Sequence, residues 1–355
     1  MKIYIQATAA ISPQKTFGEV PFLTELIEYN GNRLQTIEPE YKSFIDAKSL
    51  RRMSRIIKMG VAAASACLQE ANEKNPGAII TGTTYGCLED TGVFLTEVIQ
   101  RNEELPPPTA FIQSTHNTVG AQVALLLKCH NYNNTFVHNG FSFESALLDA
   151  LLLLKENETD NVLVGSVDEL TDHSFTVLNR LGLYKRTAVS NMDLYSLKSK
   201  GTIAGEGAAF FFLTNIYAAD AYAVLEGMAT FYQPADIKEV EHQIVSFLSA
   251  HHSNLQDIDL VITGKNGDVK EDEIYEQLQK SIFANNQLIQ YKHLCGEYPT
   301  ATSFALWMAA SILRTGAIPV VTGYQVAKEG APKMILIYNH YQHKYHSLLL
   351  VSAVE

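Results

Sequence analysis

Residues 202–213 constrain the fold of this chain more than any other segment. They read Thr-Ile-Ala-Gly-Glu-Gly-Ala-Ala-Phe-Phe-Phe-Leu, so a Gly-Glu-Gly bend leads directly into small and then large apolar residues. Glycine tolerates backbone conformations and close approaches that other residues cannot adopt, and aromatic residues favour strands. The segment therefore predicts a tight bend that enters a β-strand.

The rest of the chain alternates between short apolar strands and amphipathic helices. We expect helices at residues 49–72, 90–101, 118–129, 142–156, 234–251, 271–284 and 299–313. We expect strands at residues 2–11, 78–81, 135–138, 161–165, 223–232, 260–263, 287–291, 319–324, 333–338 and 345–351. Three prolines in residues 105–108 require a non-helical connection. This alternation predicts an α/β fold with mixed, largely parallel sheets covered by helices.

The two halves of the pattern resemble each other. Each contains a strand, a polar or glycine-containing turn and a helix rich in alanine and leucine, at residues 142–156 and 300–313. A chain of 355 residues is long enough for two such units. We therefore expect two similar lobes packed together, formed by residues 1–217 and 218–355.

Composition excludes several classes of protein. A net charge of −11 and a pI near 5.5 argue against a protein that binds nucleic acid or an anionic membrane. The basic stretch at residues 48–58 leaves an acidic carrier protein possible as a partner, although a solvated helix face explains it more simply. The four cysteines form no Cys-x-x-Cys pair, so no metal site is indicated. Because we find neither a signal peptide nor eighteen consecutive apolar residues, we expect a cytoplasmic protein without a membrane span.

The bend at Gly205, Glu206 and Gly207 resembles the Gly-Asp/Glu-Gly-Ala strand entry of the β-ketoacyl synthases, a family of the thiolase-like superfamily. Residues 49–72 are similar to that family's Arg-Met-x-Arg helix, and residues 162–169 to one of its strands. The resemblance implies a thiolase-like α/β fold, with two similar lobes of mixed sheets and helices in five layers. It also implies a catalytic Cys at the start of a buried helix and two His in the second lobe.

The segment at residues 140–150 resembles the family's nucleophile helix but carries no cysteine. In the family, Ala-Leu and Ala follow six and ten residues after the Cys, which puts Gly140 at the nucleophile position. A shift of one residue would put Phe141 there, and neither side chain can attack a thioester. Ser142 is a possible nucleophile, but it would need a base, and a helix cap is the simpler interpretation.

Both histidine positions of the family are also substituted. Counting back from Asp272 puts Gly264 at the first position, in a segment that reads as a turn or, alternatively, as an anion-binding loop around Lys265. The family's Lys-x-x-x-Gly-His motif retains Lys292 here but ends in Glu297. A carboxylate cannot donate a hydrogen bond to an enolate as an imidazole does, and we expect Glu297 to pair with Lys292.

The family's C-terminal Asn-x-Phe-Gly-x-Gly-Gly loop is replaced at residues 339–346 by a segment rich in His and Tyr. Bulky residues cannot follow the backbone path of a glycine-rich loop. The spacing alternates like a hairpin. No carboxylate or second close pair of histidines completes a ligand set in the sequence, so we expect no metal there, and we expect no cofactor.

These losses favour a non-catalytic subunit similar to the chain-length factors of type II polyketide, aryl polyene, flexirubin-type or fatty-acid-like pathways. Such a subunit pairs with an active ketosynthase, which supplies Cys, His and His, and the pair takes substrates from an acyl carrier protein. The strand at residues 135–139 would then extend the partner's sheet. Candidate walls for the acyl chain are Phe111, His116, Asn117, Phe141 and Phe143.

Two other functions remain open from the sequence. One is an acyltransferase or condensing enzyme with an altered nucleophile, either Ser142 or Cys295, and with His138 or His293 as its base. The other is a homodimeric protein that binds acyl groups outside any synthase complex.

Overall fold

The computed structural model describes residues 2–18, 22–104, 108–319 and 330–355. Within these ranges the long strands form one ten-stranded sheet with the order β10-β9-β11-β12-β8-β1-β7-β5-β3-β4. A separate two-stranded ribbon joins β2 (Asn30–Gly31) to β6 (Val189–Ser190). None of the described helices is long and apolar enough to cross a membrane.

The ten-stranded sheet consists of two halves with the same internal order. The first half runs β4 (Tyr132–Phe136), β3 (Ala78–Gly82), β5 (Asn161–Asp168), β7 (Gly207–Thr214) and β1 (Tyr4–Ile11). The second half runs β10 (Leu288–Gln290), β9 (Leu260–Thr263), β11 (Met334–Tyr341), β12 (Tyr345–Ser352) and β8 (Ala223–Tyr232). In each half the first three strands are parallel and the last two pair antiparallel. This repetition matches the two similar lobes expected from the sequence, and the predicted boundary after residue 217 falls between β7 and β8.

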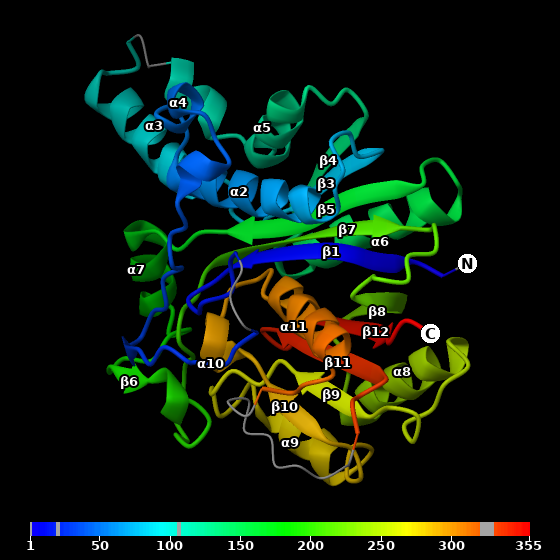
Figure 1. Ribbon diagram of the computed structural model, residues 1–355. Coiled ribbons are helices and arrows are strands. Elements are labelled where there is room, and N and C mark those ends of the chain that lie inside the picture. The colour runs from blue at the N-terminus through cyan, green and yellow to red at the C-terminus, as the bar shows by residue number, and fades with distance from the viewer. Residues whose placement is uncertain (1, 19–21, 105–107, 320–329) are drawn as a thin grey trace.

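Helices cover both halves and fill the space between them (Figure 1). One outer layer contains α2 (Arg55–Glu70) and α5 (Thr118–Leu127), the middle layer α6 (Ser142–Lys155) and α11 (Thr302–Thr315), and the other outer layer α8 (Ile237–Ala250) and α9 (Glu273–Lys280). The main hydrophobic core surrounds α6 and α11, and two further cores lie under the outer helices. These are the five layers that the resemblance implied.

The remaining described elements are short or lie at the periphery. They are α1 (Ala47–Leu50), α3 (Leu88–Gln100), α4 (Pro108–Gln113), α7 (Asp172–Arg180), α10 (Lys292–Cys295) and the 3-10 turns Tyr41–Ser43, Asn139–Phe141 and Asn191–Asp193. The helix α4 forms in what the sequence suggested was a loop. Proline is tolerated at Pro108 because the first turn of a helix needs no backbone donor there.

The helix expected at residues 49–72 is in fact two helices, α1 and α2. The Asp46 carboxylate accepts the backbone N–H groups of Lys48 and Ser49 and so caps α1. The chain then becomes extended at Ser54, where ψ is 173°, before α2 begins. Asp and Ser are both favoured immediately before a helix, so one start signal, Asp46, preceded the amphipathic pattern and a second, Ser54, lay within it.

One expected strand lies at other residues than predicted, and another falls largely outside the described residues. The strand expected at residues 135–138 is β4, Tyr132–Phe136, so His138 lies in the turn that leads to α6 rather than in the sheet. Residues 320–324 of the expected strand 319–324 lie outside the described residues, as do residues 105–107 of the proline connection.

Candidate functional site

The candidate catalytic positions gather around the hairpin formed by β11 and β12. Gly140 touches Tyr345 at the start of β12, and Gly264 touches Asn339 in β11. Glu297 lines a small cavity of about 140 Å³ together with Tyr341, at the end of β11. The β11–β12 hairpin, which stands in place of the family's glycine-rich loop, therefore packs against Gly140 and Gly264 and shares a cavity with Glu297.

Gly140, which the resemblance put at the nucleophile position, lies in the turn between β4 and α6. A Cβ atom added to Gly140 would come 2.8 Å from Cγ and 2.9 Å from Cβ of Tyr345. Tyr345 also packs edge-on against Phe141, with ring centroids 5.1 Å apart, and its hydroxyl accepts a hydrogen bond from Asn139. The space beside Gly140 is thus filled by an aromatic ring, and a thiol could not be accommodated without moving it.

Ser142 is fully buried at the first position of α6. Its hydroxyl accepts the backbone N–H of His138 at 2.9 Å and donates to the carbonyl of Asn139 at 2.9 Å. The Thr84 hydroxyl lies 3.4 Å away. These bonds tie down the turn before the helix and leave the hydroxyl bonded to backbone groups and another hydroxyl rather than to a base.

Gly264, which was predicted to stand at the family's first His position, follows β9 directly. A Cβ there would come 2.0 Å from Oδ1 of Asn339 and 2.6 Å from the hydroxyl of Tyr275. Asn339 is itself held in place, because its Oδ1 accepts from Tyr291 at 3.0 Å and its Nδ2 donates to Thr302 at 2.9 Å. The side chain of Asn339 occupies the volume in which an imidazole would be needed.

Glu297, which was predicted to stand at the second His position, forms the expected pair with Lys292. The Lys292 Nζ atom lies 2.8 and 2.7 Å from the two carboxylate oxygens, and Lys292 is fully buried. Asn266 donates a further hydrogen bond of 2.8 Å to Glu297. A carboxylate engaged by a cation and an amide in this way is a structural acceptor, and the pair replaces the hydrogen-bond donor that an imidazole would supply.

The Gly-Glu-Gly bend brings two distant segments into backbone contact. A Cβ on Gly205 would come 2.1 Å from the carbonyl oxygen of Cys295, and the Gly205 N–H bonds to the carbonyl of Glu297 at 3.0 Å. Glu206 is fully buried and accepts from the guanidinium of Arg55 at 2.7 Å and from the backbone of Leu170 at 2.9 Å. The motif therefore positions the Glu297 segment, and Arg55 from the basic stretch serves an internal ion pair.

The alternative nucleophile Cys295 is fully buried in α10. Burial raises the pKa of its thiol well above the ordinary value, against the lowering effect of Lys292, so the reactive thiolate is disfavoured. Of the two candidate bases, His293 packs edge-on against Tyr195, and the ring of His138 stacks on Phe141.

The five candidate wall residues do not line one cavity within the described part of this chain. Phe143 lies in the main core and packs against Phe211, and Phe141 lies between His138 and Tyr345. The other three are exposed, namely Phe111, His116 and Asn117. An acyl tunnel would need a second chain to cover these exposed residues.

The His-rich segment has the hairpin form expected, but the reason given against a metal ion there is wrong. Glu271, which precedes α9, places its carboxylate 3.4 Å from Nδ1 of His340 and 3.8 Å from Nε2 of His343. Burial, with the neighbouring Glu297 and Asp268, raises the pKa of Glu271 to about 7. The carboxylate missing from the local sequence is thus supplied by tertiary structure.

Sequence reasoning missed two buried carboxyl groups near these positions. Asp168, at the end of β5, accepts from Thr83 at 3.0 Å, from the Thr84 N–H at 2.8 Å and from Thr300 at 2.8 Å. It ties together three segments, and burial raises its pKa. Glu144 is fully buried in α6, and burial raises its pKa to about 7. In the sequence, each of the two appears as a charged residue within a largely apolar stretch. Burying a charged side chain costs free energy unless it is hydrogen-bonded or paired, so such a residue indicates a structural role.

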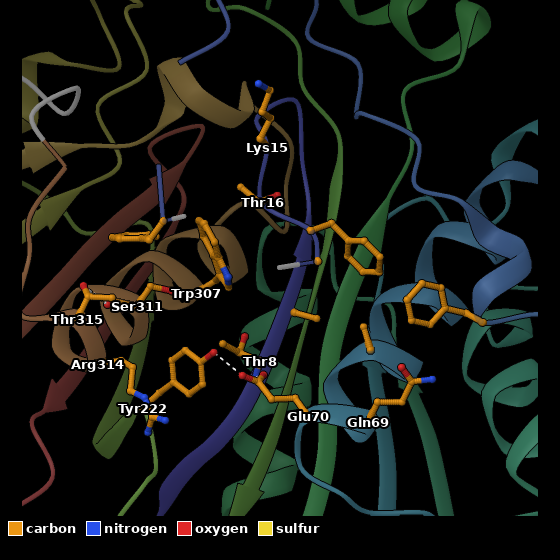
Figure 2. Close-up of a pocket in the computed structure, with 16 residues that line it drawn as sticks. Thr8, Lys15, Thr16, Gln69, Glu70, Tyr222, Trp307, Ser311, Arg314 and Thr315 are labelled. Carbon is orange, nitrogen blue, oxygen red and sulfur yellow. Dashed lines mark hydrogen bonds between the residues drawn. The ribbon is translucent and has the colours of Figure 1, made fainter. Parts of the chain in front are cut away.

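A separate cavity of about 620 Å³ lies between α2 and α11 over β1 (Figure 2). Its acidic group, Glu70, accepts from the Thr8 N–H at 3.0 Å and from the hydroxyl of Tyr222, and the Arg314 guanidinium lies 5.3 Å from the centre of the Tyr222 ring. None of the candidate positions lies in it. Its polar groups are engaged with one another rather than arranged around a reacting atom.

Known proteins share the fold of this chain, and one family model matches part of it. Residues 30–192 match the family model of the β-ketoacyl synthase N-terminal domain. The structure titled the ishigamide ketosynthase/chain length factor superimposes with a TM-score of 0.81 at 18% identity, covering 100% of this chain and 99% of that one. No curated protein matches by sequence.

Two further solved structures give the same result. A β-ketoacyl synthase from Burkholderia phymatum STM815 superimposes with a TM-score of 0.75 at 14% identity, covering 100% of both chains. The ketosynthase ApeO in complex with its chain length factor ApeC, from Xenorhabdus doucetiae, gives 0.74 at 14% identity, covering 99% of this chain and 98% of that one. At these identities the likeness establishes the thiolase-like ketosynthase fold.

Proposed function

We propose that this chain, whose residues 30–192 belong to the β-ketoacyl synthase family and whose whole fold is that of the ketosynthases, is a non-catalytic ketosynthase-like subunit of the chain-length-factor type. In this role it pairs with an active ketosynthase in a type II polyketide, aryl polyene or fatty-acid-like pathway. The partner supplies the nucleophilic Cys and both His, and this chain supplies interface contacts and walls for the acyl chain.

The observation that carries the proposal is the aromatic ring of Tyr345 against Gly140. A condensing enzyme must hold its acyl group on a side chain at this turn, and here the place is taken. The same replacement occurs at Gly264, where Asn339 fills the space, and at Glu297, where Lys292 engages the carboxylate. Because all three positions are packed or paired, restoring one side chain would not restore the chemistry.

The edge of the sheet supports a partner subunit. The last strand in the order is β4, and it has a neighbour on one side only among the described strands. Large apolar side chains on β4 and on the two helices that flank it are exposed, in the range of 45–68%. They are Leu125 in α5, Tyr132 in β4, Val137 just after it, and Leu148 and Leu152 in α6. An unpaired edge bordered by apolar residues favours strand-to-strand pairing with another chain.

The candidate walls fit this arrangement. Phe111 is 57% exposed on α4 and its neighbour Ile112 is 61% exposed. His116 and Asn117 follow in the same exposed segment before α5. In the proposed pair, these side chains and Phe141 bound the space that receives the acyl chain, whereas Phe143 stabilises the core beneath them. An acyl carrier protein delivers the substrate to the partner's Cys.

Two alternatives make different chemical demands. An acyltransferase would need Ser142 or Cys295 as nucleophile, but Ser142 is bonded to the backbone of its own turn and burial keeps the Cys295 thiol protonated. A homodimeric acyl-binding protein would use the same β4 edge with a second copy of this chain. This geometry disfavours the acyltransferase. The homodimeric acyl-binding protein differs from the proposed subunit in its partner, which is a second copy of this chain and not a ketosynthase.

Co-expression with a neighbouring ketosynthase that retains its Cys and both His tests the proposal. Native mass spectrometry should give a one-to-one heterodimer, and cerulenin or an acyl-carrier thioester should label only the ketosynthase. This chain expressed alone, and the ketosynthase alone, are the controls. Labelling of this chain would establish the altered enzyme instead, and a stable homodimer that ignores the synthase and binds lipid would establish the acyl-binding protein.

A further inference from the structure

We propose that Glu271, His340 and His343 form a binding site for a divalent transition-metal ion, with zinc as the first candidate. One ligand atom from each of these side chains lies within 4.8 Å of the other two. Glu271 precedes α9, whereas the two histidines lie at the end of β11 and in the hairpin turn that follows. The site is independent of the proposed function, because none of its ligands stands at a catalytic position of the family.

The hydrogen bonds of His340 make it ready to coordinate a cation. Its Nε2 lies 2.9 Å from the backbone carbonyl of Glu271, and a carbonyl can only accept, so Nε2 carries the proton. The Nδ1 atom therefore presents a lone pair, consistent with the His343 N–H that points to it at 3.3 Å. This is the arrangement of metal-binding histidines, whose second nitrogen commonly donates to a backbone carbonyl.

The lone pair of His340 Nδ1 faces the side-chain Oε2 of Glu271 at 3.4 Å. Two atoms at this separation can be bridged by a proton or by a metal cation that replaces the proton. In a tetrahedral zinc site each ligand atom lies about 2.0–2.1 Å from the ion. Two such ligand atoms are then about as far apart as His340 Nδ1 and Glu271 Oε2 are here. The His340–Glu271 pair therefore already has the spacing that a shared metal ion requires.

His343 completes the set from the solvent side. Its Nε2 lies 2.9 Å from the carbonyl of Lys270 and so carries the proton, which leaves Nδ1 as its lone-pair nitrogen. The ring stacks on that of His340, with centroids 4.7 Å apart, and its side chain is 41% exposed. The His343 atom that lies 3.8 Å from the Glu271 carboxylate is Nε2, so coordination requires this exposed ring to give up its bond to the Lys270 carbonyl.

The scaffold around the cluster holds the turn in place. His346, buried in β12, lies within hydrogen-bonding distance of the His343 carbonyl through Nε2, at 3.2 Å, and of the Tyr338 hydroxyl through Nδ1, at 3.0 Å. The backbone at Gln342 and His343 is left-handed, with φ of 53° and 51°. His346 thus acts as a positioning residue that keeps His343 folded back over His340.

The ligand types select the class of metal. Two imidazoles and one carboxylate suit zinc and neighbouring transition metals, whereas magnesium and calcium prefer sites made only of oxygen. Three protein ligands leave a fourth position for water or for a group from outside the chain. The four cysteines are all buried elsewhere and supply no competing thiol site.

The test is metal binding by the full chain, purified without a polyhistidine tag and stripped with chelator. Zinc added to the stripped protein and removed by gel filtration should leave one ion per chain, measured by elemental mass spectrometry. Titration calorimetry with zinc chloride gives the affinity, and cobalt chloride should produce the visible absorption of a tetrahedral site. His343→Ala and Glu271→Gln should each weaken zinc binding by about tenfold or more.

Two features of the design keep the result decisive. His343 is exposed and Glu271→Gln preserves shape, so both variants should keep the circular dichroism spectrum of the parent protein. His130→Ala, at an exposed histidine after α5, is the matched control and should bind zinc as the parent does. The assignment is overturned if the parent retains no zinc, if both cluster variants bind as tightly as the parent, or if His130→Ala loses binding equally.

Discussion

The aromatic ring of Tyr345 lies directly over Gly140, so that a Cβ on the glycine would come 2.8 Å from Cγ of the tyrosine. The contact joins the start of β12 to the turn before α6, residues that are far apart in the sequence. If this turn is the nucleophile position, as we propose, the contact replaces a reactive side chain by packing. The loss of the nucleophile would then be built into the shape of the site and not only into its composition.

Gly140→Ala should destabilise the fold by about 1–3 kcal/mol, because the added methyl group overpacks a filled site. The φ angle of Gly140 lies outside the left-handed region, so backbone strain does not contribute. Urea unfolding followed by circular dichroism measures the change. When Gly140→Ala is made in the Tyr345→Ala variant, the loss of unfolding free energy should be clearly smaller, because the ring that obstructs the methyl group is gone.

Gly92→Ala is the control for that experiment. A Cβ at Gly92, within α3, would have its nearest neighbour 3.9 Å away, and alanine is favoured over glycine in a helix. This variant should be neutral or slightly stabilising. Equal losses of stability for Gly92→Ala and Gly140→Ala would show that the Tyr345 contact is not the cause.

Lys292→Met should cost about 3–5 kcal/mol of stability, because it leaves the carboxylate of Glu297 buried without its cation. Lys292→Met combined with Glu297→Gln should recover most of the loss, since no charge then remains unpaired and Asn266 keeps its acceptor. Lys15→Met breaks an exposed pair with Glu25 and should cost less than about 1 kcal/mol. Chemical denaturation at neutral pH measures all three, and a double variant no more stable than Lys292→Met would contradict the pairing argument.

Glu144→Gln should remove part of the pH dependence of stability. Burial raises the pKa of Glu144 from its usual 4.5 to about 7, so the folded state holds a proton that the unfolded state has lost. This contribution is fully present below pH 4.5 and is lost as the pH rises to about 7. Above that range the variant should be more stable than the parent, on the order of 3 kcal/mol.

The measurement is urea unfolding at a series of pH values from acid to mildly alkaline. Glu156→Gln is the control, because Glu156 is exposed at the end of the same helix and should leave the pH profile unchanged. A Glu144→Gln profile parallel to that of the parent would rule out this source of pH dependence.

Leu148→Asp and Leu152→Asp should each weaken the proposed heterodimer by about tenfold or more, because a charge would be buried at an apolar interface. Both leucines are 46% exposed, so the free chain should stay folded. Val245→Asp, equally exposed at 46% on α8, tests whether any new surface charge has the same effect. Affinity for the co-expressed ketosynthase, measured by biolayer interferometry, should fall only for the two α6 variants.

The elements that could be predicted from the sequence are those with a strong local pattern. The strand after Gly207 is a continuous apolar run behind a glycine bend, the helices at residues 142–156 and before residue 313 are long apolar segments, and each of the three is present. The break between α1 and α2 was missed because an amphipathic stripe continued across it. The short helix α4 was missed because Pro108, at its start, is the last of three consecutive prolines, which predicted a non-helical connection.

The pair of Lys292 and Glu297 was predictable because the two residues lie close together in sequence and are complementary in charge. The contacts of Glu271 with His340 and His343 were not, because the carboxylate and the imidazoles lie on different elements. The same holds for Asp168, whose partners Thr83 and Thr300 come from both halves of the chain.

The sequence by itself determined that this chain builds two similar halves of strands and helices, and it carries the prediction that Gly140, Gly264 and Glu297 stand where a ketosynthase would need Cys and His. These properties depend on residue type and local spacing, which a sequence states directly. Tertiary structure alone decided that Tyr345 packs against Gly140 and Asn339 against Gly264, and which carboxylate meets the hairpin histidines. Most such contacts join residues distant in the chain, and they arise only when buried layers pack at close to crystalline density.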